Sequence, residues 1–515
     1  MSVIEDRYVP PPLPQNGYEF VAAAALFRNF GGLSVYVKYK GGPTDKITVK
    51  AKTGNYIWLI CPDRELVLVQ NNYSMEAFYP WADGFDECIN FNMFDDHVAK
   101  RLGITQIMTN YVHSKGTKNS RLPARLPPED RITVLSDSGG LQLSREVSGL
   151  IHPKDLATFY KENVDAGMTL DIPLFGMEDA ELLDRAARLQ RRNTEIMIKY
   201  KGDVELLNIF HGKSYEERNT FRKIVETSEI NRCAIGGVGH DPLLTSVNNI
   251  YSIVNEGQRY KQYHVLGIFI ATHIPVLVKL ANSGENPPFI TSDSTSHIQS
   301  ASNRAYHYQF DILHTSRRIA IGSNGAIPSP LRQLPCQCLV CTTLKYTDIL
   351  AFGEGRILTE MLAIHNAIEM SRYSAQLQQA AVELSPKEYN LLVRAQLKRH
   401  PKLKEVEASL DFIDLAVNKT LKAAQTKYSA ALSKKPMKAS NLGLGLAGLF
   451  GDGDPEASVS GRFGTTKEEI NALMQRMEDQ ITPSKKKKTR LNADVPITIK
   501  HDNTTPKLIK RRAAK

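Results

Sequence analysis

Short apolar runs alternate with amphipathic helical stretches along the middle of this chain, and this alternation limits the fold more than any other feature. The runs occupy 66–72, 104–110, 132–138, 168–174, 204–212, 233–239, 263–269 and 289–294. Uniformly hydrophobic strands separated by helices are typical of a parallel sheet that is covered on both faces. Eight such strands predict an α/β fold, a (β/α)8 TIM-like barrel over residues 65–371, with a doubly wound open sheet as the alternative.

The segment before the barrel, residues 1–64, is predicted to be an N-terminal extension. Pro10 to Pro14 form a rigid extended stretch. Residues 18–30 favour a helix, and 33–40 followed by 45–52 favour a hairpin across a Gly-Gly-Pro-Thr turn. This segment is interpreted as an appendage or as a lid over one end of the barrel.

After the barrel the pattern changes to helices and then to low-complexity sequence. Residues 372–435 are predicted to form a helical extension, and the glycine-rich stretch 436–464 a flexible linker. A Thr465-to-Glu468 capping box predicts a short helix that ends near residue 481. The rest of the segment 436–515 is a basic tail that we expect to be disordered when free.

The net charge of +10 is concentrated in that tail. Residues 484–515 contain 11 basic and 2 acidic residues, so the body of the chain is nearly neutral. A basic tail is typical of proteins that bind polyanions, most often nucleic acid. A solvated tail without a specific partner is the alternative.

Three cysteines and one histidine have the spacing of a metal site. Cys336, Cys338 and Cys341 lie within six residues, and His365 follows on a predicted helix. Thiolate and imidazole ligands suit tetrahedral Zn²⁺, and four protein ligands leave no position open for water. The pattern predicts a structural zinc in a subdomain inserted at about 333–371. The alternative is a group of thiols unrelated to the helix histidine.

The cysteine content and the lengths of the apolar runs bear on where in the cell the protein is expected. Only six cysteines occur, and three of them belong to the cluster, which favours a reducing intracellular compartment over a disulfide framework. The N-terminus lacks a basic stretch followed by an apolar one, and no apolar run approaches 18 residues. A cytoplasmic protein without a membrane partner is therefore expected.

Polar residues gather where several of the runs end. They are Asp137, Asp171, His211, Gly236, Gly237, Gly267 and Asp293. Barrel enzymes build their active sites at the carboxyl ends of the strands, so these residues are predicted to share one site. The alternative for each aspartate alone is a helix N-cap.

Several motifs in one order resemble the tRNA-guanine transglycosylases. They are SDSGGLQ (136–142), LDIP (170–173), FHGKSYEERN (210–219), AIGGVG (234–239), HVLGIF (264–269), FITSDS (289–294) and the Cys₃His set. The resemblance covers about residues 130–370 and implies a (β/α)8 barrel with a zinc subdomain. It also implies exchange of a guanine in a polynucleotide for a free 7-deazaguanine base.

The resemblance assigns a role to each aspartate. Asp293 would attack C1′ of the sugar, Asp137 would act as the general acid and base, and Asp171 would bind the guanine edge. The backbone of Gly236 and Gly237 would bind the base carbonyl oxygen. The other substrate-binding residues that it implies are Ser138, Leu141, His211, Leu266 and Gly267.

The chemistry calls for such residues independently of any family. Breaking an N-glycosidic bond builds positive charge on the sugar, which a carboxylate can trap covalently. A second carboxyl group must move a proton, and a third can accept the N–H donors of guanine. The target base must leave the stack to reach a pocket at the strand ends.

Departures from the tRNA enzymes bear on the substrate. His211 stands where those enzymes usually have glutamine, and Leu141 where they have an aromatic residue. Residues 372–515 show helices and a basic tail instead of the β-rich RNA-binding domain of archaeal members. These features favour the branch of bacteriophages and bacterial DNA-modification clusters, which inserts 7-deazaguanines of the preQ0 type into DNA and serves restriction evasion; a phage protein would act in the host cytoplasm.

Three functions therefore remain as expectations. The first is a DNA-guanine transglycosylase, and the second a tRNA-guanine transglycosylase. The third is a non-catalytic subunit that binds nucleic acid, like the inactive partner in heterodimeric tRNA enzymes. The joint presence of Asp137, Asp171 and Asp293 argues against the third. A homodimer is a further possibility that the sequence leaves open.

Overall fold

The structure is a computed structural model of the 515-residue chain. The residues that it describes are 16–23, 33–39, 56–61, 64–70, 87–90, 93–94, 96–114, 131–140, 143, 149–172, 174, 180–212, 214–238, 241–256, 259–268, 272–294, 296–302, 305–308, 317–320, 336, 338, 340–341, 356–398, 400–433 and 467–482.

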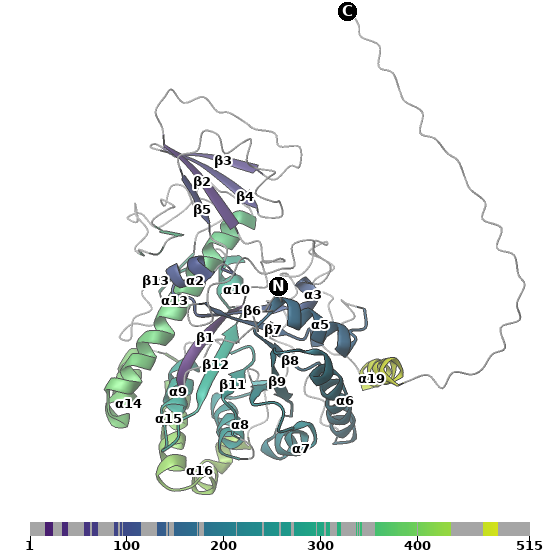
Figure 1. Cartoon of the computed structure of the whole chain (residues 1–515). Coiled ribbons are helices and arrows are strands. Elements are labelled where there is room, and N and C mark those ends of the chain that lie inside the picture. Colours follow the sequence, from purple (N-terminus) through teal and green to yellow (C-terminus); the bar gives the residue numbers. More distant parts are fainter. Residues whose placement is uncertain are drawn as a thin grey trace, which may run out of the picture.

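Eight parallel strands close into a barrel, as the alternation of the sequence predicts (Figure 1). Around the barrel the order is β1-β12-β11-β10-β9-β8-β7-β6, and β1 pairs with β6 to close it. The strands are β1 (Gly17–Ala23), β6 (Gln106–Asn110), β7 (Thr133–Asp137), β8 (Ala166–Met168), β9 (Glu205–Phe210), β10 (Arg232–Ile235), β11 (Gln262–Val265) and β12 (Phe289–Ser294). The closed parallel barrel excludes the doubly wound open sheet.

The first barrel strand is not the one predicted. The run 66–72 falls largely in β4 (Arg64–Gln70), which belongs to a separate antiparallel sheet with the order β3-β4-β2-β5. The predicted helix over 18–30 is wrong in its first part, because residues 17–23 form β1 and pair with both β12 and β6. Pairing on both sides outweighs the helix propensity of the alanines, because a buried strand gains ladder hydrogen bonds and packing. The barrel therefore begins near residue 17, not at 65.

The antiparallel sheet lies in sequence between β1 and β6. Its strands are β2 (Leu33–Tyr39), β3 (Tyr56–Cys61), β4 and β5 (Glu87–Asn90). The predicted strand over 33–40 forms as β2, but its neighbours are β4 and β5. The predicted second half of that hairpin, 45–52, and the stretch Pro10–Pro14 lie outside the described residues. Because the insertion follows the carboxyl end of β1, it leaves the barrel on the side where α10 (Ser296–Ser302) also lies (Figure 1).

The inside of the barrel is a packed core. Alternate strand residues point inward, and one inner cluster consists of Val21, Met108, Leu135, Ala166, Met168, Leu207, Ile209 and Ala234. Side chains of this kind fill the interior of such barrels in layers, so the barrel is not a pore. A site can form only above this layer, at the strand ends.

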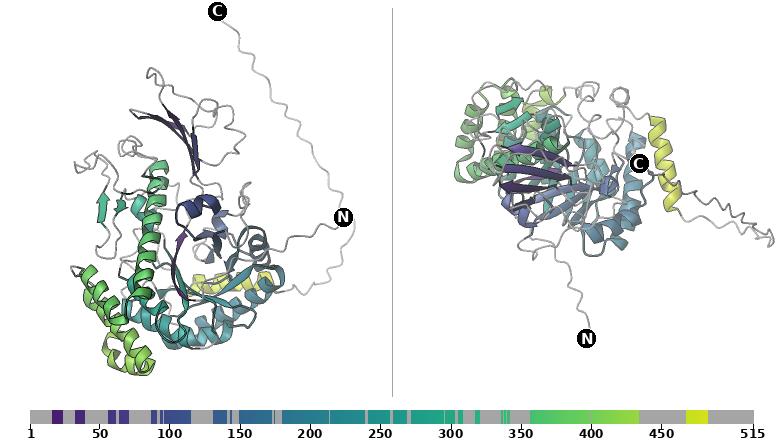
Figure 2. Two further views of the ribbon diagram at one scale, coloured as in Figure 1. Left: turned by 60° about the vertical axis from the view of Figure 1, so that its left-hand side comes forward. Right: turned by 90° about the horizontal axis from the view of Figure 1, so that it is seen from above.

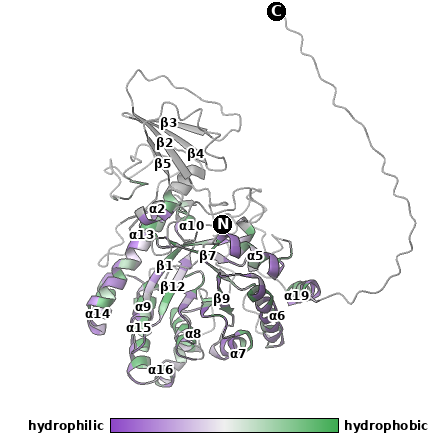
Figure 3. Ribbon diagram, viewed as in Figure 1, coloured by the Kyte–Doolittle hydropathy of each residue, from purple (hydrophilic) through white to green (hydrophobic). Residues whose placement is uncertain are grey.

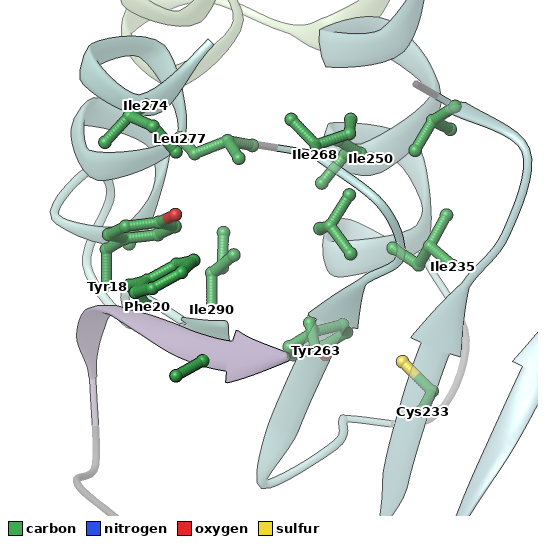
Figure 4. Packing of buried hydrophobic residues seen from close by; sticks show 14 of the residues in the cluster. Tyr18, Phe20, Cys233, Ile235, Ile250, Tyr263, Ile268, Ile274, Leu277 and Ile290 are labelled. Atoms are coloured by element: carbon green, nitrogen blue, oxygen red, sulfur yellow. The ribbon is translucent and has the colours of Figure 1, made fainter. Parts of the chain in front are cut away.

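The outer faces of the strands pack against a ring of helices. The helices that follow the strands are α5 (Pro153–Asn163), α6 (Ala180–Tyr200), α7 (Tyr215–Val225), α8 (Leu243–Asn255), α9 (Ile274–Ala281) and α13 (Arg356–Glu383). Figure 4 shows Tyr18 and Phe20 of β1 beside Ile274 and Leu277 of α9, and Ile235 of β10 near α8. Large apolar side chains thus join the two layers.

Four short elements complete the described part of the chain before α13. They are α2 (Asp96–Arg101), α3 (Tyr111–Ser114), and the antiparallel pair β13 (Ala305–Tyr308) and β14 (Arg317–Ala320). Helix α13 packs on β1, α9, α10 and β13. It runs without a break through residues 371 and 372, so the predicted domain boundary falls inside a helix.

The C-terminal helices form a second layer over part of the ring (Figure 2). They are α14 (Pro386–Gln396), α15 (Leu403–Asn418), α16 (Leu421–Lys427) and α17 (Ser429–Leu432). Helix α15 packs against α8 and α9. All eight residues of α9 are consequently buried, as expected of a helix that is covered on all sides. Figure 3 shows α9 in the hydrophobic colour, whereas the outer helices α6 and α14 carry many hydrophilic residues.

Helix α19 (Lys467–Ile481) docks on α6. Arg185 of α6 donates to Glu478 at 2.8 Å, to Gln475 at 2.9 Å and to Asn471 at 3.1 Å. The predicted short helix therefore exists, although Thr465 lies outside the described residues. The predicted linker 436–464 and basic tail 484–515 also lie outside them. Among the described helices, none is long and apolar enough to cross a membrane.

Candidate active site and metal centre

The three aspartates predicted from the motifs all lie at or just beyond the carboxyl ends of barrel strands. Asp137 is the last residue of β7, and Asp293 lies one residue before the end of β12. Asp171 follows β8 by three residues. The strand predicted over 168–174 occupies 166–168 instead, because the N–H of Leu170 turns away from the ladder to the sulfur of Met197. The loop after β8 thus carries Asp171 towards the other two.

Asp137 is the carboxyl group with a strongly raised pKa. Burial, and after it the negative charges of Asp171 and Asp293, raise its pKa to about 7, against hydrogen bonds that lower it. One of those bonds comes from Asn110, whose Nδ2 donates to Oδ2 at 2.6 Å. Asn110 ends the neighbouring strand β6, directly across the ladder from Asp137. A carboxyl group that is half-protonated near neutral pH is suited to general acid and base catalysis.

Asp171 is held by hydrogen-bond donors on both oxygens. Ser138 Oγ donates to Oδ1 at 2.7 Å, and His211 Nε2 lies 2.8 Å from Oδ2. Ser138 is fully buried, and both Asp171 and His211 are nearly so. Each carboxyl oxygen can accept more than one hydrogen bond, so lone pairs remain for a ligand with N–H groups. Ser138 and His211, predicted as substrate-binding residues, are therefore placed to orient Asp171.

Gly140 makes this arrangement possible. A Cβ added there would come within 2.5 Å of Asp171 Oδ1 and 2.8 Å of its carbonyl oxygen. Only glycine allows the chain after β7 to pass this close to the loop after β8. Leu141, the next residue and a predicted substrate contact, lies outside the described residues.

The two glycines after β10 differ in what they offer a ligand. Gly236 donates its N–H to the carbonyl oxygen of Phe210 at 3.0 Å, and its own carbonyl oxygen accepts from Arg218 at 2.6 Å. Both backbone polar groups of Gly236 are therefore hydrogen-bonded within the protein, and its role with the base stays a prediction. Gly237 is exposed, has a φ of 74° and makes no hydrogen bond through its N–H to the described residues. Of the two glycines, Gly237 is thus the one whose N–H can bind a ligand carbonyl in this geometry.

Asp293 receives a backbone donor from the neighbouring strand end. The N–H of Gly267 donates to Oδ1 at 2.8 Å, which a φ of 71° at this glycine allows. His264 Nε2 lies 3.3 Å from the same oxygen. Among the described residues, Oδ2 of Asp293 has no hydrogen-bond donor. Gly267, predicted to contact substrate, thus contacts Asp293 through its N–H, and the half-buried Leu266 packs on the inner barrel cluster.

Sequence reasoning missed Asn110, Gly140 and His264. Asn110 ends an apolar run in the same way as the chosen residues, so the same signal was available. Gly140 lies inside a quoted motif, but its close contact with Asp171 depends on how two loops meet. His264 lies within an apolar run, where a histidine is usually part of the core.

The predicted metal ligands form one buried cluster. One ligand atom from each of Cys336, Cys338, Cys341 and His365 lies within 4.8 Å of the others. His365 lies in α13, and its Nδ1 is 3.4 Å from Cys338 Sγ and 3.3 Å from Cys341 Sγ. Hydrogen bonds from the neighbouring thiols, first that of Cys338, hold the pKa of Cys336 far below its usual value. Three thiols and an imidazole nitrogen can hold one metal ion here.

The surroundings of the cluster fix its ligands. Nε2 of His365 hydrogen-bonds the carbonyl oxygen of His307, which leaves the Nδ1 lone pair facing the thiols. The Tyr306 ring stacks on the His365 ring at 3.9 Å, and its hydroxyl lies 3.0 Å from Cys341 Sγ. Such contacts orient metal ligands before a metal binds. The cluster thus ties the segment 336–341 to α13 and β13.

No protein-family model matches the chain, and a search of curated proteins found no match.

Proposed function

We propose that this protein exchanges guanine in DNA for a free 7-deazaguanine base of the preQ0 type, through a covalent glycosyl-aspartate intermediate. One observation carries the proposal: three aspartates meet at one end of the barrel, each in a different environment. Asp137 has a pKa of about 7, Asp171 accepts from two side chains, and Asp293 keeps one oxygen without a donor. Base exchange needs an acid, a base-binding carboxylate and a nucleophile.

In the first half-reaction, Oδ2 of Asp293 attacks C1′ of the target nucleotide. The C1′–Oδ2 bond forms and the C1′–N9 bond breaks, and the electron pair of the broken bond leaves with the guanine. Protonated Asp137 gives its proton to the departing guanine, because guanine is a poor leaving group as an anion. The products are free guanine, an ester on Asp293 and ionised Asp137.

The second half-reaction reverses these steps with another base. N9 of the incoming 7-deazaguanine attacks C1′, the C1′–Oδ2 bond breaks, and Asp293 recovers its carboxylate. Ionised Asp137 takes the N9 proton of the incoming base. The enzyme returns to its initial protonation state, so the exchange needs no external acid, base or reductant.

Asp171 and Gly237 are proposed to hold the base. The carboxylate of Asp171 accepts from the N–H groups on the guanine edge, and the N–H of Gly237 donates to the carbonyl oxygen. Guanine and the 7-deazaguanines share this edge, so one pocket serves both half-reactions. Guanine and the 7-deazaguanines differ at position 7, which takes no part in the proposed contact with Asp171.

DNA is favoured over tRNA by the part of the chain from residue 356 onward. From Arg356 to Leu432 the described elements are all helices, and they cover the barrel wall on α8 and α9. A β-rich RNA-binding module of the archaeal type has no counterpart in these residues. The basic segment 484–515 adds positive charge that suits either polyanion.

The third candidate, a non-catalytic subunit, would need none of this geometry. Asp137 has a pKa of about 7, which suits a group that transfers protons. A subunit that only binds nucleic acid has no need of such a group. The Cys₃His cluster is proposed to hold a structural zinc, because four protein ligands leave no site for substrate.

Labelled guanine tests the reaction class and the substrate together. Purified protein is incubated with tritiated guanine and either double-stranded DNA or total tRNA, and label in the polymer is counted. We expect incorporation into DNA and loss of incorporation in Asp293→Ala. Incorporation into tRNA alone would establish the second function, and none into either polymer would leave the non-catalytic subunit.

A further inference from the structure

A column of buried polar side chains runs up one side of the barrel interior to Asp293. Arg232 Nη1 donates to Gln262 Oε1 at 3.0 Å, and Gln262 Nε2 donates to Thr291 Oγ1 at 2.9 Å. Thr291 Oγ1 lies 2.9 Å from His264 Nδ1. Each of these four side chains is at most 2% exposed, so water does not compete for the bonds.

The proton positions in this column follow from its first member. Arginine can only donate, so the Gln262 oxygen faces Arg232 and the Gln262 amide nitrogen faces Thr291. Thr291 then accepts from Gln262. Among the described residues its own hydroxyl hydrogen has one acceptor, the Nδ1 lone pair of His264. The His264 proton therefore resides on Nε2.

That Nε2–H faces the nucleophile. Nε2 lies 3.3 Å from Asp293 Oδ1 but makes no hydrogen bond to any described residue in this geometry, although His264 is fully buried. A buried donor without a partner is rare in proteins, and it points to a bond that forms in another state of the site. A small rotation of the Asp293 carboxylate brings Oδ1 into line with it.

We propose that His264 is a positioning residue for Asp293, held in one tautomer by Thr291, Gln262 and Arg232. This inference rests on the proposed function, since it concerns the nucleophile of that reaction. His264 and the Gly267 N–H together bind Oδ1 and turn Oδ2 towards the sugar. The column thus decides which oxygen of Asp293 attacks.

His264 acts most strongly when the covalent intermediate breaks down. In the ester, Oδ1 is a neutral carbonyl oxygen, whereas in the free carboxylate it carries negative charge. Hydrogen bonds to charged acceptors are stronger than those to neutral ones, so two fixed donors on Oδ1 stabilise Asp293 as a leaving group. Loss of His264 should therefore slow discharge of the adduct more than its formation.

The test compares the two half-reactions in four full-length variants. His264→Leu removes the donor, and His264→Gln places an amide N–H near the position of Nε2. Thr291→Val removes the hydroxyl that donates to His264 Nδ1 and accepts from Gln262, with little change of shape. His273→Leu is the matched control, because His273 at the start of α9 is also buried and its Nε2 also lacks a partner.

Adduct formation on double-stranded DNA is timed by quenched-flow and denaturing gels, and its discharge is timed after addition of guanine. In His264→Leu we expect discharge to slow by about 10- to 100-fold, with a smaller effect on formation and accumulation of adduct. His264→Gln should recover most of the loss, Thr291→Val should lie between, and His273→Leu should match the wild type.

Equal slowing of both half-reactions by His264→Leu would overturn the inference, as would wild-type discharge in a folded His264→Leu or Thr291→Val protein. Thermal melting of each variant shows whether it is folded, and Thr291→Val keeps the test valid if His264→Leu does not fold. A wild-type protein that forms no adduct with any polynucleotide contradicts the proposed function itself, which is a separate result.

Discussion

Nε2 of His211 lies 2.8 Å from Oδ2 of Asp171, and both side chains are buried at the mouth of the barrel. This contact holds one oxygen of Asp171 in a fixed direction. Under the proposed function, Asp171 accepts from the base, so His211 would act on base recognition through Asp171.

Replacement of Asp171 by asparagine should damage base recognition more than bond cleavage. The amide adds N–H donors that oppose those of guanine, so we expect the KM for free guanine to rise by about 10- to 100-fold, the range for one mispaired polar group. Guanine titration of the exchange rate measures this. The Asp184→Asn variant, altered at an exposed position of α6, is the control. An unchanged KM would show that Asp171 does not bind the base.

The pKa of Asp137 predicts opposite pH profiles for the two half-reactions. Adduct formation needs the protonated acid, so its rate should fall as pH rises through about 7. Discharge by an incoming base needs the ionised form, so its rate should rise through the same pH. Single-turnover rates between pH 5.5 and 8.5, on the order of 1.5 units either side of that pKa, test both trends.

Asp137→Asn should remove both pH trends and slow both half-reactions by about 10²- to 10⁴-fold, the usual contribution of a general acid or base. The amide can still pair with Asn110, so the fold should persist. Profiles that rise and fall together, or that survive in Asp137→Asn, would assign the proton transfer to another group.

The cluster of Cys336, Cys338, Cys341 and His365 should bind one zinc ion per chain. Cys338→Ser should release the metal and lower the melting temperature by roughly 10 °C or more, since metal binding at such sites is coupled to folding. Elemental analysis and thermal melting measure the two effects. Cys233→Ser, which alters a buried cysteine outside the cluster, should retain zinc. A folded wild-type protein without zinc would contradict this assignment.

The segment 484–515 should strengthen binding to nucleic acid without selecting its sequence. It carries most of the net positive charge, and phosphate contacts by lysine and arginine release counterions. Deleting it should weaken binding and flatten the dependence of the affinity on salt, while site preference stays the same. Affinities for nucleic acid at several salt concentrations give the slope of affinity against salt. An unchanged slope after truncation would show that the tail does not contact the phosphates.

Helix α19 gives this prediction a matched control. Arg185 of α6 contacts three polar residues of α19, so the helix that precedes the tail is held on the barrel. Arg185→Ala should weaken the docking of α19 but leave every charge of the segment 484–515 in place. We expect it to preserve the salt slope, which separates the charge of the tail from its attachment.

The barrel was predictable because its strands are buried on both faces. Seven of the eight predicted runs overlap a barrel strand, since continuous apolar runs between helices have few other interpretations. The first strand was mispredicted because it leads into a run of four alanines at 22–25, and its strand state depends on pairing with β12 and β6. The pairing with β12 joins residues more than 250 positions apart, which local sequence patterns do not reveal.

The candidate site was predictable as a set of residues but not as a set of contacts. Asp137, Asp171 and Asp293 follow from strand ends and motifs. Gly236 donates its N–H to Phe210, and Gly267 donates to Asp293. Both contacts depend on the register between neighbouring strands, which the sequence does not reveal. The partners of buried polar groups are decided by three-dimensional neighbours, so His264 was overlooked.

The most direct test of the account is to map the covalent adduct. Enzyme is trapped on its polynucleotide under denaturing conditions, digested and analysed by mass spectrometry. The account predicts one nucleotide esterified to Asp293, no adduct or exchange in Asp293→Ala, and a slowly formed adduct in Asp137→Ala. An adduct on Asp137, or base exchange that survives in Asp293→Ala, would contradict it.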